Sequence, residues 1–178
     1  YLAYAVFGAM SLDGLKSTRS IHAKVLNPHE IDELFDEIAY EKGGSILRMI
    51  DEYLSPSVYR EGLRNYIKKF EYANADADDL WNSLQDVSRK PVKEIMRKYV
   101  LQEGFPLVES SIKDRMLNLK QERFFYLEYK DENKWTVPLV IKLRKKRYTG
   151  VVIERKEKKI RFKKSPYLYI NTDYSGFF

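Results

Sequence analysis

The feature that most constrains this chain is a change of pattern near its middle, at Gly104-Phe105-Pro106. Before this point, apolar residues recur at the three- and four-residue spacing of amphipathic helices, whereas short aromatic-rich runs separated by turn residues follow it. The charge changes at the same place, because residues 1–101 carry a net charge of −2 and residues 102–178 a net charge of +8. The sequence therefore predicts an α+β chain, with an all-α helical block over 1–101 followed by a small β-sandwich over 102–178.

Five helices are expected in the first part. Asn27 can cap a helix whose first residue is Pro28, and Asp76 is favourable near the start of a later helix. The apolar spacing places the five helices at residues 28–38, 41–54, 55–70, 76–87 and 90–100.

Six strands are expected in the second part, at the short and regular spacing that is typical of a sandwich. Asp131-Glu132-Asn133 and Thr149-Gly150 are expected hairpin turns. The strands are expected at residues 116–119, 124–129, 135–143, 151–154, 160–163 and 167–170.

Composition excludes several kinds of chemistry. The 178 residues include no cysteine, so a disulfide framework, a thiolate nucleophile and a zinc finger are excluded. Two histidines are present, and His29-Glu30 would need a second histidine at position 33, where Glu33 stands, to form a zincin helix. His22 has no partner in the sequence. No apolar run approaches the ~20 residues of a membrane helix, and we expect no metal site made by this chain alone.

A basic stretch over residues 142–164 is interleaved with Tyr148 and Phe162. Basic groups beside aromatic rings can neutralise phosphates and stack on bases, which is how single-stranded nucleic acid is bound. Alternating charges also coat the solvated face of exposed strands, where lysines block aggregation. Because no RNA-binding motif accompanies the run, the sequence favours the solvated surface over nucleic-acid binding.

Tyr40 stands between two helical segments, just before the pair Gly43-Gly44. Each glycine in a helix costs about 1 kcal/mol relative to alanine, so the pair suggests that something packs against the backbone there. Considered alone, Tyr40 is one of fourteen tyrosines, and such a residue usually packs with a satisfied hydroxyl. The acidic residues before it, which include Asp36, are interpreted as the solvated face of a helix.

At these residues the sequence resembles the M1 family of zinc aminopeptidases, and among its members the archaeal aminopeptidases that interact with the tricorn protease. Arg19-Ser20 departs from the family pattern, which has His-Pro there, and Tyr99 replaces a usual tryptophan. The segments that carry the resemblance are 9–18, 36–49, 62–70, 74–81, 102–106, 119–124, 135–139, 170–171 and 176–178, in the family's order.

The resemblance implies a piece of a larger enzyme that removes N-terminal residues from peptides. It assigns residues 1–101 to the end of the thermolysin-like catalytic domain and residues 102–178 to the family's small β domain. Tyr40 matches the tyrosine that stabilises the transition state. Phe35 matches a residue lining the pocket for the N-terminal side chain, although a core aromatic on a helix is an equally good interpretation.

The same resemblance implies a Zn2+ ion whose ligands lie upstream of Tyr1, outside this chain. It also implies peptide substrates, the remaining domains of the enzyme and a complex such as tricorn as partners, and a cytoplasmic location. The apolar residues at both ends agree with a piece of a longer chain. The competing hypothesis is a non-catalytic interaction or spacer module, whose basic β surface binds a polyanion or a protein partner.

Overall fold

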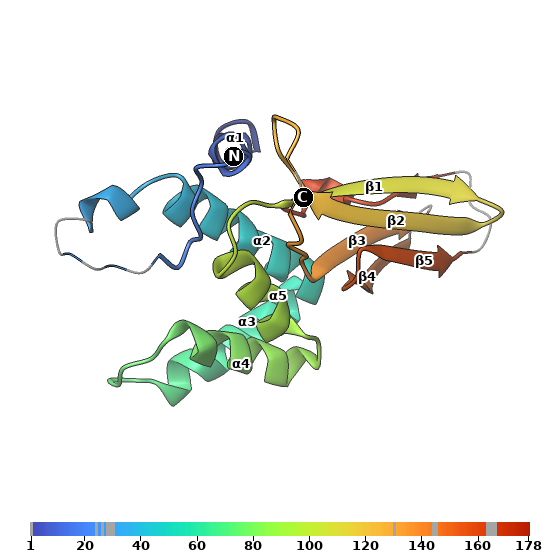
Figure 1. The fold of residues 1–178 in the computed structure, drawn as a ribbon. Coiled ribbons are helices and arrows are strands. Elements are labelled where there is room, and N and C mark those ends of the chain that lie inside the picture. The colour runs from blue at the N-terminus through green and yellow to red at the C-terminus, as the bar shows by residue number, and fades with distance from the viewer. Residues whose placement is uncertain are drawn as a thin grey trace.

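The computed structural model describes residues 2–23, 25, 27, 31–129, 131–143, 146–162 and 167–178 (Figure 1). Within these ranges the chain is mixed α+β, with helices in the first half and two small antiparallel sheets in the second. The α-helices are α1 (Phe7–Asp13), α2 (Gly43–Leu54), α3 (Pro56–Lys69), α4 (Ala77–Ser88) and α5 (Val92–Val100). Two π-helical turns, Leu2–Val6 and Ile38–Lys42, lead directly into α1 and α2.

Local signals explain where the later helices start. Pro56 occupies the first turn of α3, where a missing N–H costs nothing. Asp76 caps α4 in a capping box: its carboxylate accepts from the Asp79 N–H at 3.0 Å, and the Asp79 carboxylate accepts from the Asp76 N–H at 3.1 Å. Close packing of α3 on α4 depends on Gly62, because a Cβ there would lie 2.7 Å from Leu84 Cδ2.

The expected helix over residues 28–38 is wrong. Residues 28–30 lie outside the described ranges, and the rest of the segment is a short 3-10 turn, Asp32–Leu34, followed by a break at Phe35 with φ −84° and ψ 67°. A contact distant in sequence explains the break: Arg19 donates to the Leu34 carbonyl at 3.1 Å, an acceptor that a continuous helix would use internally.

The two sheets have the strand orders β1-β2-β5 and β4-β3-β6, with every pairing antiparallel. The strands are β1 (Pro106–Lys113), β2 (Met116–Arg123), β3 (Val137–Leu143), β4 (Lys146–Ile153), β5 (Glu157–Arg161) and β6 (Leu168–Tyr169). β2 and β3 belong to different sheets, so the expected hairpin turn at 131–133 is wrong. Thr149-Gly150, expected to be a turn, lies inside β4.

The expected strand at 124–129 is also wrong. After the Phe124 N–H donates to the Phe105 carbonyl at 3.0 Å, the chain leaves the sheet. Its rings pack against the end of α1 instead, and a Cβ on Gly14 would lie 2.9 Å from both Phe124 and Tyr126. Aromatic residues favour strands because they pack well on a sheet, and here they pack on a helix end.

One buried apolar cluster joins the two halves of the chain. Helices α2 and α5 and strands β2, β3 and β4 all contribute side chains with little or no exposure. The cluster includes Ile46, Ile50, Tyr53, Ile95, Tyr99, Leu117, Leu119, Trp135, Val137, Leu139, Ile153 and Phe177.

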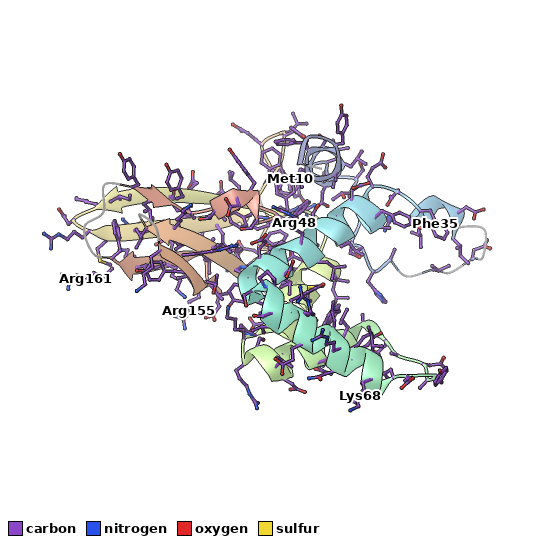
Figure 2. All side chains as sticks on the ribbon, turned by 180° about the vertical axis from the view of Figure 1, so that it is seen from behind. Met10, Phe35, Arg48, Lys68, Arg155 and Arg161 are labelled. Atoms are coloured by element: carbon purple, nitrogen blue, oxygen red, sulfur yellow. The ribbon has the colours of Figure 1, made fainter. Side chains whose placement is uncertain are left out.

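The C-terminal segment returns to α2. Arg48 donates to the carbonyls of Tyr174 at 2.7 Å and Asp173 at 3.0 Å, and the Phe177 N–H lies 3.5 Å from Met49 Sδ. Figure 2 shows Phe35 and Arg161 at opposite ends of the molecule, with Arg48 between them. In the described part of the chain, no helix has the length and apolar character needed to cross a membrane.

Candidate active site

Tyr40 lies in the π-helical turn Ile38–Lys42. The Lys42 N–H donates to the Glu37 carbonyl at 3.0 Å, which is the five-residue spacing of a π turn, while the Tyr40 N–H reaches the Asp36 carbonyl at 3.1 Å. Single π turns inside helices are rare and frequently occur at functional sites. This turn sends two nearby side chains in opposite directions, since Tyr40 is 61% exposed and Lys42 is fully buried.

Phe35 and Tyr40 form an exposed aromatic pair at the start of α2. Their ring centroids are 6.1 Å apart with an interplanar angle of 27°, and Phe35 is 64% exposed. Neither ring belongs to the buried core of this chain, so Phe35 is not the core aromatic that one interpretation of the sequence proposed. Within the described part of the chain, no group hydrogen-bonds to the Tyr40 hydroxyl.

The turn that carries Tyr40 is capped by Asp36. Its Oδ1 atom accepts from the Ala39 N–H at 2.9 Å and from Arg19 Nη2 at 2.7 Å. The capping bond satisfies a backbone donor of the first turn, and the guanidinium fixes the carboxylate. The interpretation of Asp36 as a solvated residue on a helix face is therefore wrong, and Arg19, at the position that departs from the family pattern, is its partner.

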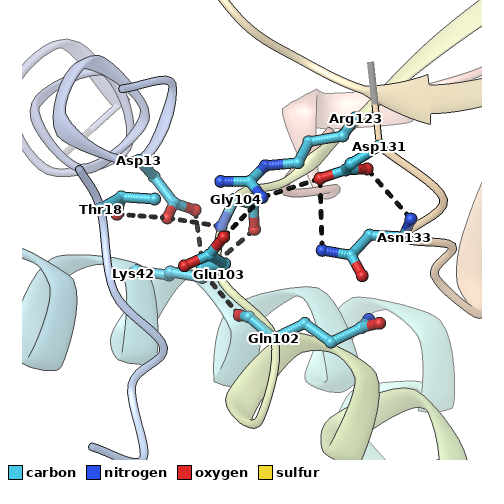
Figure 3. Close-up of polar contacts among 9 residues, drawn as sticks. All are labelled: Asp13, Thr18, Lys42, Gln102, Glu103, Gly104, Arg123, Asp131 and Asn133. Carbon is cyan, nitrogen blue, oxygen red and sulfur yellow. Dashed lines mark hydrogen bonds and ion pairs between the residues drawn. The ribbon is translucent and has the colours of Figure 1, made fainter. Parts of the chain in front are cut away.

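The last residue of this turn, Lys42, forms a buried ion pair that the sequence analysis did not predict (Figure 3). Lys42 Nζ lies 2.9 Å from Asp13 Oδ2, and both side chains have 0% exposure. The ammonium also donates to the carbonyls of Gly104 at 3.1 Å and Gln102 at 3.4 Å. The other Asp13 oxygen accepts from the Gly104 N–H at 2.9 Å and from the Thr18 hydroxyl at 3.0 Å. We call these five residues the Lys42 network.

Burial lowers the pKa of the Lys42 ammonium from its usual value of 10.5, and the Asp13 carboxylate opposes this shift. A signal for the buried lysine was present in the sequence. Lys42 stands four residues after Ile38 and four before Ile46, so it occupies the buried stripe of the helix. The carboxylate that pairs with it is distant in sequence and carried no comparable signal.

A second charged group adjoins this network. Arg123 Nη1 donates to Glu103 and Asp131, both at 2.8 Å, and its guanidinium stacks over the Phe125 ring at 4.4 Å. Only 3% of the arginine side chain is exposed. Gly104 packs directly on it, since a Cβ at that position would lie 2.3 Å from Arg123 Nε. The link between α5 and β1 is thus held from both sides by paired charges.

The described residues do not fit a zinc site. No group of three His, Cys, Asp or Glu side chains among them could hold a metal ion. His22 is exposed, and its backbone N–H donates to the Val100 carbonyl at 3.0 Å. His29 lies outside the described residues.

Sequence comparisons identify the relatives of this chain. The profile of the peptidase family M1 domain matches residues 1–99. The chain is 38% identical over 172 residues to probable aminopeptidase 2 of Sulfurisphaera tokodaii, covering 96% of this chain and 22% of that protein. It is 40% identical over 134 residues to the tricorn protease-interacting factor F2 of Thermoplasma acidophilum, covering 75% of this chain and 17% of that protein.

A leucyl aminopeptidase of Saccharolobus solfataricus is 33% identical over 170 residues, which is 96% of this chain and 22% of that protein. The chain thus spans about a fifth of the length of these curated relatives. The profile covers more than half of the chain, and its matched residues include the turn that carries Tyr40. The chain belongs to the peptidase family M1.

Proposed function

We propose that this chain is part of a zinc-dependent aminopeptidase that removes N-terminal residues from peptides, and that Tyr40 stabilises the transition state. The observation that carries the proposal is the exposed Tyr40 ring, held on a capped π turn in the part of the chain that matches the family. Peptidase family M1 enzymes are generally zinc-dependent. As the family resemblance implies, we propose that the zinc ligands lie outside this chain.

The chemical role of Tyr40 follows from charge development during amide cleavage. Attack on the scissile carbonyl converts its oxygen into an oxyanion, which needs a hydrogen-bond donor already in place. A tyrosine phenol, with a reference pKa near ~10, carries its proton at pH 7 and can donate it in a hydrogen bond. Such a bond strengthens as charge develops, so it lowers the barrier more than it tightens substrate binding. The Tyr40 hydroxyl is available for this role, because no described group forms a hydrogen bond with it.

Phe35 extends the proposal to substrate binding. Its exposed ring lies beside the Tyr40 ring, where it can contact the N-terminal side chain of a peptide. Aromatic rings supply large apolar contact area with little loss of side-chain entropy. Truncation of Phe35 to alanine should therefore raise KM for substrates with apolar N-terminal residues and leave kcat nearly unchanged.

The remaining proposals concern organisation and partners. We assign residues 1–101 to the end of the catalytic domain and residues 102–178 to a small β-sandwich, whose two sheets contribute to one buried cluster. Two of the relatives are named tricorn protease-interacting factor F2, and this supports a partnership of the whole enzyme with a proteolytic complex of that kind. We also propose a cytoplasmic location.

The test is Tyr40→Phe in the full-length enzyme that contains this chain, assayed with an aminoacyl anilide. Loss of one oxyanion donor should lower kcat by about 10²–10³, with KM changed by less than about threefold. Tyr72→Phe is the matched control, because Tyr72 is fully exposed in the loop before α4. A Tyr40→Phe enzyme with near wild-type kcat would remove Tyr40 from the mechanism.

A second candidate function is an interaction module with a basic surface. A basic surface of this kind requires exposed cations, and β5 with the residue before it presents three, Lys156, Lys159 and Arg161. One basic group on the neighbouring strand β2 is already paired, however, since Lys120 lies 2.9 Å from Glu109 and 3.2 Å from Glu122. Salt-dependent binding of the chain to heparin would favour this candidate. Restored peptidase activity on adding the missing part of the enzyme would favour the aminopeptidase.

A further inference from the structure

The Lys42 network joins three segments that are distant in sequence. Asp13 ends α1, Lys42 ends the turn that carries Tyr40, and Gln102 and Gly104 lie in the link between α5 and β1 (Figure 3). Hydrogen bonds are directional, so a network of this kind fixes relative positions in a way that apolar packing does not.

The ammonium is held by two hydrogen bonds to carbonyls and one ion pair. A lysine has three N–H donors, and Lys42 has three acceptors within 3.4 Å: the Asp13 carboxylate and the carbonyls of Gly104 and Gln102. A buried ion pair is weak evidence for stability, because the loss of hydration offsets the attraction between the charges. Because stability alone does not account for such a pair, its place at the end of the turn that carries Tyr40 points to a role in positioning that turn.

Tyr40 itself has few restraints. Its ring is 61% exposed, its ring neighbour Phe35 is also exposed, and no described group binds its hydroxyl. The position of the hydroxyl therefore depends on the backbone of the turn. That backbone is anchored on one side by the Asp36 cap and on the other by Lys42, two residues beyond the tyrosine.

We propose that Asp13 and Lys42 are positioning residues for catalysis, which hold the Tyr40 hydroxyl in place through the turn Ile38–Lys42. This inference rests on the proposed function of Tyr40. A hydrogen-bond donor is effective only when it is held within about 0.5 Å of the productive position, and a misplacement of about 1 Å can lower the rate by about 10². Removal of the pair should therefore act on kcat, through Tyr40 alone.

The experiment is a double-mutant cycle in the full-length enzyme. Lys42→Met should lower kcat by about 10- to 100-fold with little change in KM. In the Tyr40→Phe background the same substitution should lower kcat by less than about threefold, because the group that it positions is already missing. A structural role would give the same loss in both backgrounds, and that result would overturn the proposal.

Lys90→Met is the matched control. Like Lys42, Lys90 has three polar partners. Its Nζ donates to the Tyr53 carbonyl at 2.6 Å and to the Thr149 carbonyl and hydroxyl at 3.1 and 3.2 Å, and so links the helical half to a strand. Lys90 contacts Tyr53 near the C-terminal end of α2, whereas Tyr40 precedes the N-terminal end of this helix. We expect Lys90→Met to lower the melting temperature while changing kcat by less than about threefold in either background.

A second variant guards against misfolding of Lys42→Met, which leaves Asp13 as an unpaired buried charge. The double variant Asp13→Asn/Lys42→Met leaves no charge and keeps an oxygen for the Gly104 N–H. It should fold and show the same loss of kcat as Lys42→Met. Failure of both variants to fold, or a wild-type kcat in the folded double variant, would assign the pair to stability and overturn the inference. The kcat of the single variant Tyr40→Phe tests the proposed function of Tyr40 independently of Asp13 and Lys42.

Discussion

Gly104→Ala and Gly43→Ala make the same chemical change, and the structure predicts opposite signs for their effects on stability. Gly104 has φ +78°, where a side chain costs roughly 1–2 kcal/mol. An added Cβ would also lie 2.3 Å from Arg123 Nε, so the guanidinium must move away from its carboxylate partners. Complete loss of such a pair costs about 3–5 kcal/mol, and we take a partial loss of about 1–2 kcal/mol.

Gly104→Ala should therefore destabilise the chain by about 2–4 kcal/mol and lower Tm by roughly 5–15 °C. At Gly43 the backbone is helical, with φ −56° and ψ −50°, and an added Cβ would meet no atom of the described chain within 4 Å. The sequence suggested that something packs against the backbone at Gly43-Gly44, and at Gly43 no described atom does. Gly43→Ala should stabilise it by about 0.5–1 kcal/mol, because alanine loses less entropy in a helix.

Thermal unfolding of the 178-residue chain, followed by circular dichroism at 222 nm, measures both shifts. Urea unfolding at 25 °C provides the free energies, and an unchanged m-value would show that the extent of unfolding is the same in both variants. A Tm for Gly104→Ala equal to or above that of the wild-type chain would refute the reasoning. So would a Gly43→Ala variant that is destabilised by more than about 1 kcal/mol.

Gly62→Ala should destabilise the chain by about 1–3 kcal/mol in urea unfolding, because its Cβ would lie 2.7 Å from Leu84 Cδ2 and 3.1 Å from the Leu84 Cα atom; wild-type stability would contradict this. Asp36→Ala removes the oxygen that accepts from the Ala39 N–H, whereas Asp36→Asn keeps one. Asp36→Ala should therefore lower kcat of the full-length enzyme more than Asp36→Asn does, and equal losses of kcat would argue against a role of the cap. The hydrogen bond from Lys93 lowers the pKa of Asp78 below its usual 3.8, so the pair contributes stability above pH 3.8 that is lost as the pH falls through the folded-state pKa. A carboxyl NMR titration that places the pKa of Asp78 at or above 3.8 would contradict this expectation.

The elements predicted best from sequence are those whose signals are local. Helix α3 starts at a proline and α4 at an aspartate cap, and both were expected within one or two residues of their observed starts. The two failures among the longer segments have long-range causes. Arg19 binds the Leu34 carbonyl within the expected helix over 28–38. In the segment 124–129, Phe124 and Tyr126 pack against Gly14 at the end of α1, so this segment does not continue the sheet. Strand β1 was not predicted, because its residues are mostly exposed and do not alternate between apolar and polar side chains.

The candidate site shows the same division. Physical chemistry alone could not distinguish Tyr40 from thirteen other tyrosines, and the resemblance to a family selected it. Lys42 could be placed on the buried stripe of a helix, but its partner Asp13 lies 29 positions away. Contacts between residues so far apart depend on the folded topology, and no pattern in one sequence reports them.

The most direct test of the central claim measures binding to the transition state rather than the rate. A phosphinic pseudopeptide, whose tetrahedral anionic group mimics the oxyanion, is titrated against the full-length enzyme and its Tyr40→Phe variant. If Tyr40 donates to the developing charge, the variant should bind the pseudopeptide about 10²–10³ times more weakly, in proportion to its loss of kcat/KM, and should bind the free amino-acid product as before. Equal affinity of the two enzymes for the pseudopeptide would contradict the account.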